Sequence, residues 1–123
     1  MMVVATNAPL NARSLNRLAQ RAIMGLARTG SHASNGSGDY VIAFSTAPEL
    51  QHRHNSLEPL EGAPTLRNDR LSPLFQATIE ATEEAIYNSL LKAVDVVGRN
   101  GNERQALPIE KLIEIGRKYN RLQ

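Results

Sequence analysis

The chain has 123 residues, 41% of them hydrophobic and 21% charged, which is the composition of one globular domain and argues against wholesale disorder. Its formal net charge is only +2 and it has few aromatic residues and no tryptophan, so a nucleic-acid-binding surface is not expected. The absence of cysteine excludes disulfides, thiolate metal sites and a cysteine nucleophile within this chain.

The first part of the chain predicts a strand, a helix and a second strand. Residues 1–5 are all apolar, which is typical of a buried strand. Asn11 suits the N-cap of a helix that runs to about Arg28 and stops at Gly30. Residues 40–46 are a short, almost wholly apolar run, as expected of a strand covered on both faces. Four arginines alternate with the apolar residues of the helix and are interpreted as its solvated face: Arg13, Arg17, Arg21 and Arg28.

The second part of the chain predicts a long loop and two helices. Residues 47–69 are polar, contain three prolines and show no periodicity, so they are expected to form a functional or interface loop. A long helix is expected over residues 72–97, with Ser72 as its N-cap. A turn at residues 100–101 and a final helix from Pro108 complete the chain.

These elements indicate an α/β fold with an incomplete sheet. Two strands alone cannot support a core of this size, so further strands are expected from another polypeptide. Residues 1–123 are interpreted as one domain that another chain completes. The longest apolar run has only five residues, far short of the roughly 20 that a membrane span needs, so no membrane partner is expected. The compartment stays open, with the cytoplasm as the expected location.

The tract over residues 30–39, Gly-Ser-His-Ala-Ser-Asn-Gly-Ser-Gly-Asp, is the most informative segment. Glycine and serine bring little apolar surface, and by composition alone the tract fits a flexible linker equally well. However, it joins a well-formed helix to an apolar strand, and active-site groups are often placed on such connections. Ser37 and Asp39, where the chain re-enters the strand, are therefore candidate site residues.

Other chemistries find weaker support. The tract runs from a helix into a strand, the wrong polarity for a phosphate-binding glycine loop. His52 and His54 lack a third ligand, so a solvated loop is favoured over a metal site. His32 can be read as the base of a serine triad, but no strand-to-helix nucleophile elbow is present. Glu80 and Glu84 share a helix face, which is more simply a solvated acidic face. No metal or cofactor is expected.

Four blocks of sequence, in order, carry a family resemblance: VVATNAPL at residues 3–10, GLARTGS at 25–31, GSGD at 36–39 with AFST at 43–46, and PLFQATIEATEEAIYNSLL at 73–91. Together they resemble the self-processing L-aminopeptidase/D-amidase-D-esterase family, also called β-peptidyl aminopeptidases. The resemblance covers nearly the whole chain and is weakest across residues 49–66. In that family a precursor cleaves itself into a long N-terminal and a short C-terminal subunit, and this chain resembles the short one.

The resemblance implies a fold, a reaction and partners. The family has a four-layer α/β/β/α sandwich similar in architecture to N-terminal-nucleophile hydrolases, and the long subunit would complete it here. The implied activity releases N-terminal residues from small peptides, amides or esters through an acyl-enzyme. Cleavage frees a serine at the start of the short subunit, whose hydroxyl is the nucleophile and whose α-amine can act as general base. The two-subunit unit is expected to form a higher homo-oligomer.

Within this sequence, the family's second active-site serine and its nearby acidic residue match Ser37 and Asp39. The nucleophilic serine itself would lie two positions before Met1 and is absent from this sequence. The alternative is therefore a catalytically dead fragment that acts as a structural or assembly partner. If the family interpretation holds, strands 1–5 and 40–46 are neighbours and Met1 lies within about 12 Å of Ser37.

Overall fold

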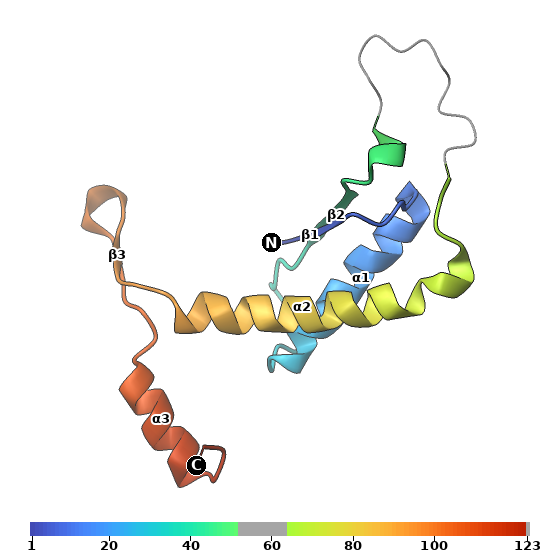
Figure 1. The fold of residues 1–123 in the computed structure, drawn as a ribbon. Coiled ribbons are helices and arrows are strands. Elements are labelled where there is room, and N and C mark those ends of the chain that lie inside the picture. The colour runs from blue at the N-terminus through green and yellow to red at the C-terminus, as the bar shows by residue number, and fades with distance from the viewer. Residues whose placement is uncertain (52–63, 123) are drawn as a thin grey trace. The chain divides into compact units, whose positions relative to one another are not determined.

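The computed structural model describes residues 1–51 and 64–122, which form two compact units, Met1–Glu84 and Ala85–Gln123. Its elements are drawn in Figure 1 and follow in chain order: β1 (Met2–Thr6), α1 (Ala12–Arg28), β2 (Val41–Ser45), the 3-10 turns η1 (Pro48–Leu50) and η2 (Asn68–Arg70), α2 (Ser72–Leu91), β3 (Val96–Val97), the turn η3 (Arg99–Gly101), β4 (Glu103–Arg104) and α3 (Ile109–Lys118). Each unit is described by itself below.

The first unit is built on a strand–helix–strand motif. β1 and β2 pair in parallel, with a register that runs from Met2 opposite Val41 to Thr6 opposite Ser45. Parallel neighbours need a crossover connection, and α1 supplies it by packing along one face of the two strands (Figure 1). The sequence-based expectation that these two apolar runs are neighbouring strands is confirmed.

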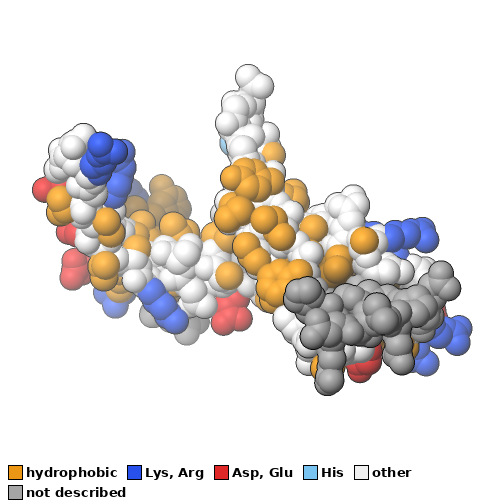
Figure 2. Space-filling model, turned by 90° about the horizontal axis from the view of Figure 1, so that it is seen from above, with side chains coloured by type: hydrophobic (Ala, Val, Ile, Leu, Met, Phe, Trp, Pro, Cys, Tyr) orange, Lys and Arg blue, Asp and Glu red, His pale blue; other side chains and the backbone are white. Residues whose placement is uncertain are grey.

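The expectation that both faces of the strands are covered is wrong within this chain. Side chains alternate along both strands, and those on the face away from α1 are open, with Val3 58% and Ile42 53% exposed. Figure 2 shows hydrophobic side chains gathered on the surface of the molecule. An all-apolar strand indicates that two faces want cover, but the described residues supply a helix for only one of them.

The hydrophobic core lies where α1 meets the chain segments that flank β1 and α2. Leu10, Leu18 and Leu71 are almost completely buried. Half-buried apolar residues pack around them: Val4, Ala8, Leu15, Leu66, Leu74 and Phe75. The N–H of Leu66 donates to the carbonyl of Pro9 at 2.8 Å, which ties the end of the 47–69 segment to this core. The central part of that expected loop, residues 52–63, lies outside the described residues.

A glycine lets α1 and α2 approach closely. A Cβ added at Gly25 would lie 2.6 Å from the carbonyl oxygen of Ile79 and 2.8 Å from the Cβ of Thr82, closer than real Cβ atoms come. Thr78 and Thr82 are buried at this contact, and each hydroxyl donates to the carbonyl four residues earlier at 2.7 Å. The buried hydroxyls are thus satisfied without a partner across the helices.

The limits of α1 agree with the sequence-based expectation. The Asn11 side chain accepts a hydrogen bond from the N–H of Ser14 at 2.9 Å, as an N-cap residue does. The helix ends at Arg28, and Gly30 follows with a φ of +96°, a conformation that favours glycine.

The arginines of α1 are not simply a solvated face. The guanidinium groups of Arg17 and Arg21 lie over the ring of Phe75, at 4.9 and 4.1 Å from its centroid. Arg28 pairs with Glu83 at 3.4 Å, and of the four only Arg13 and Arg28 are classed as exposed. The expectation is corrected for Arg17 and Arg21 because a guanidinium can cover an aromatic ring while its charge stays in water.

In the second unit the expected long helix ends early. α2 begins at Ser72 but stops at Leu91, and Val96–Val97 pair as β3 with the antiparallel strand β4. Apolar residues here follow helical spacing, yet Val94, Val96 and Val97 are β-branched and favour extended structure. Short apolar runs do not separate the two alternatives.

The turn and the last helix were predicted correctly. Asn100 and Gly101 have φ values of 62° and 72°, which match a tight hairpin turn between β3 and β4. α3 starts directly after Pro108. β3 and β4 form their own two-stranded sheet, so among the described residues the sheet of β1 and β2 keeps only two strands.

Candidate active site

The tract that joins α1 to β2 has a defined backbone shape. Gly30 and Gly36 have φ values of 96° and 94°, and Ala33 also has a positive φ of 47°. The N–H of Ser37 donates to the carbonyl of Ser34 at 2.8 Å and closes a turn around Gly36. Glycine is required at this point because the third position of such a turn takes a positive φ. The turn presents the next residues, Ser37 to Asp39, just before β2.

Ser37 and Asp39 contact each other through their side chains. The hydroxyl of Ser37 donates a hydrogen bond to the carboxylate oxygen Oδ2 of Asp39. Both residues are exposed in this chain. The bond fixes the hydroxyl hydrogen and leaves the lone pairs of the serine oxygen, together with the second carboxylate oxygen, free to accept hydrogen bonds from another group.

The start of the chain lies beside the end of this tract. The N–H of Met2 donates to the carbonyl of Tyr40 at 3.0 Å, and Tyr40 directly follows Asp39. Parallel strands begin at the same edge of a sheet, so the first residues of β1 and the Ser37–Asp39 pair share one edge. The active-site role of the pair and its distance from Met1 stay predictions.

The other sequence candidates do not gather at this edge. The hydroxyl of Ser37 donates to Asp39 rather than to His32, so the triad interpretation gains no support. His52 and His54 lie outside the described residues. Over residues 1–51 and 64–122, no group of three or more metal-binding side chains is present.

The acidic residues of α2 are solvated, as the simpler interpretation expected. Glu80 and Glu84 are exposed, and Glu80 accepts a hydrogen bond from the Gln76 amide at 2.8 Å. The nearby Thr78 and Thr82 are buried against α1 and therefore do not border an open site with them.

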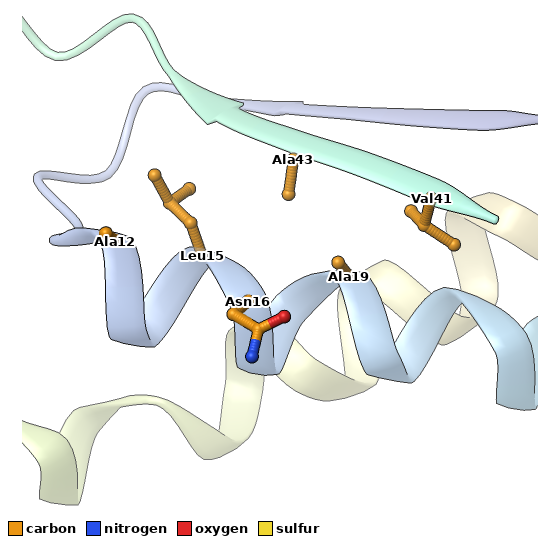
Figure 3. Close-up of a pocket in the computed structure, with 6 residues that line it drawn as sticks. All are labelled: Ala12, Leu15, Asn16, Ala19, Val41 and Ala43. Atoms are coloured by element: carbon orange, nitrogen blue, oxygen red, sulfur yellow. The ribbon is translucent and has the colours of Figure 1, made fainter.

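The structure also shows a hollow that the sequence did not predict. It has a volume of about 290 Å³, lies between α1 and β2, and is drawn in Figure 3 with its lining residues: Ala12, Leu15, Asn16, Ala19, Val41 and Ala43. Leu15 and Ala19 point up from the helix, while Val41 and Ala43 point down from the strand (Figure 3). The lining has no titratable group, so the hollow suits apolar side chains rather than catalysis.

Solved structures define the class of protein to which this fold belongs. The PH0078 protein from Pyrococcus horikoshii OT3 shares 52% sequence identity and superposes with a TM-score of 0.80, covering 98% of this chain and 34% of its own. The L-aminopeptidase D-Ala-esterase/amidase from Ochrobactrum anthropi, described as a variant of the Ntn hydrolase fold, shares 35% identity with a TM-score of 0.79, covering 99% of this chain and 34% of its own. The chain therefore has an α/β fold of the Ntn-hydrolase kind, as the resemblance implied.

The sequence comparison identifies the family. The sequence pattern of peptidase family S58 matches residues 1–104, and the chain belongs to this family. A curated relative, the beta-peptidyl aminopeptidase BapA from Sphingosinicella microcystinivorans, is 44% identical over 99% of this chain. The chain spans only 30% of that relative's length. In the part of the chain that the structure describes, none of the helices is long and apolar enough to cross a bilayer.

Proposed function

We propose that this chain is the short C-terminal subunit of a serine-nucleophile aminopeptidase or amidase. The complete enzyme would release N-terminal residues from small peptides, amides or esters, and a long N-terminal subunit of the same precursor would complete the sandwich. The names of the relatives and the fraction of their length that the chain spans support this proposal. So does the open apolar face of the sheet, which a second layer would cover. The two-subunit unit would assemble further with copies of itself.

The observation that carries the proposal is the Ser37–Asp39 hydrogen bond at the sheet edge where β1 begins. In the complete protein, the nucleophilic serine would lie two positions before Met1 and thus near this pair. Its hydroxyl oxygen would attack the substrate carbonyl carbon while its α-amine takes the hydroxyl proton and passes it to the departing amine. Water would then hydrolyse the resulting ester and regenerate the serine. Ser37 would hydrogen-bond the nucleophile, and Asp39 would orient Ser37 and favour the protonated amine.

The test uses the complete protein that contains this chain. Ser37→Ala and Asp39→Asn are each expected to lower the rate of aminoacyl-amide hydrolysis, or of self-cleavage seen by intact mass, by about 100-fold or more. Ser34→Ala is the matched control, because it removes a hydroxyl from the same tract and keeps the carbonyl that accepts from the Ser37 N–H.

Near-normal rates in both test variants, with folding unchanged by circular dichroism, would contradict the roles proposed for Ser37 and Asp39. Mass spectrometry of the short subunit provides a second readout. A serine two positions before Met1 supports the enzyme, and a chain that begins at Met1 contradicts it.

A further inference from the structure

The helix α3 leaves an apolar face open. None of the described residues of the second unit, 85–122, is buried. On α3, Ile109, Leu112 and Ile113 lie on one side of the helix and are 39%, 39% and 37% exposed. Apolar stripes of this kind normally pack against another element.

The charges beside this face are arranged in a self-complementary way. Glu110 and Arg117 lie on the same flank of the apolar face, two helical turns apart, and together with Ile113 and Glu114 they line a shallow hollow. Seven residues of helix span about 10 Å, too far for these two side chains to pair with each other. Among the described residues, neither Glu110 nor Arg117 forms an ion pair. Ile113 lies midway between them.

We propose that α3 pairs with the α3 of a second copy, antiparallel about a two-fold axis near Ile113. The apolar faces meet, and Glu110 of each copy lies against Arg117 of the other. A two-fold interface presents the same patch from both partners, and the antiparallel direction reverses the order of the charges along the shared flank. A parallel pair would place Glu110 against Glu110 and Arg117 against Arg117. The charge pattern therefore selects a second copy, in the antiparallel direction, as the occupant.

The size of α3 sets the strength of this contact. A helix of ten residues is about 15 Å long, so one pair buries less than the roughly 1,000 Å² of an autonomous interface. The contact contributes to association together with other surfaces of the complete protein and is sensitive to protein concentration. It goes beyond the proposed chemistry and does not depend on it.

Charge reversal in the complete protein tests the pairing by sedimentation velocity over a range of concentrations. Glu110→Arg and Arg117→Glu are each expected to weaken self-association about tenfold, because each places like charges together at both ends of the interface. The double variant E110R/R117E restores both attractive contacts and returns association to near the parent value. Singles that associate like the parent, or a double variant as weak as the singles, would overturn the proposal.

Cross-linking gives an independent test because the chain has no cysteine of its own. Ile113→Cys is expected to form a covalent dimer under mild oxidation, since the two copies of residue 113 meet at the axis. Lys111→Cys, on the opposite side of the same helix, is the control and is expected to give no dimer above the parent protein. Equal cross-linking of the two variants, or none at Ile113→Cys, contradicts the proposed register. Loss of serine chemistry leaves both readouts unchanged, so this proposal and the proposed function fail separately.

Discussion

The two units of the chain contain similar kinds of residue but use them differently. In residues 1–84, leucines from three separate segments are buried together at Leu10, Leu18 and Leu71. In residues 85–122, an amphipathic helix and a valine-rich hairpin leave every described side chain at least partly exposed. The comparison teaches that apolar sequence predicts a face that needs cover, while a core forms only where a second element within the unit supplies it.

The largest expected contrast is between a core residue and an exposed one. Leu18→Ala is expected to lower the free energy of unfolding of the complete protein by about 2–5 kcal/mol, because Leu18 is 1% exposed and its removal leaves a cavity. Ile115→Ala, at a residue 46% exposed on α3, is expected to cost less than about 1 kcal/mol. Urea denaturation measures both values. Equal losses would mean that the second unit has a core of its own.

A glycine from each unit sharpens the comparison. Gly25→Ala is expected to destabilise the protein by about 1–3 kcal/mol, because the new methyl group would collide with the backbone of α2. In Gly98→Ala the nearest atom is the Asn102 carbonyl oxygen at 3.4 Å, so a change within about 0.5 kcal/mol is expected. Thermal unfolding of both variants is the measurement. A stable Gly25→Ala protein would show that α1 and α2 are not in close contact.

The start of α1 provides a smaller effect. Asn11→Ala removes the acceptor for the Ser14 N–H and is expected to cost about 1 kcal/mol. Asn11→Asp keeps an acceptor oxygen at that position and is expected to lie within a few tenths of a kcal/mol of the parent protein. If both variants lose the same stability in urea, the side chain matters for a reason other than capping.

The ion pair between the two helices of the first unit is expected to matter least. Arg28→Ala removes the pair with Glu83, whose partners are 51% and 28% exposed. An exposed pair of this kind contributes less than about 1 kcal/mol, and added salt is expected to remove most of the difference from the parent protein. A larger loss that persists in high salt would show that the Arg28 side chain contributes by packing instead.

Sequence patterns predicted the parts of the fold that depend on neighbouring residues. The cap at Asn11, the end of α1 before Gly30 and the turn at Asn100–Gly101 each follow from the local chemistry of one or two side chains. The end of α2 was missed because residues 90–97 satisfy helical spacing and strand propensity at once. In the candidate site, the sequence singled out Ser37 and Asp39, but their hydrogen bond depends on the turn that Gly36 permits.

By itself, then, the sequence determined which residues form helices and strands, which tract carries polar chemistry, and to which family the chain is similar. Only the tertiary structure decided which faces are covered, because burial depends on elements far apart in the chain. It placed Arg17 and Arg21 over Phe75, put Gly25 against α2, and left one face of the sheet open. It also aligned the start of β1 with the end of the 30–39 tract, since strand register is set by pairing and not by local propensity.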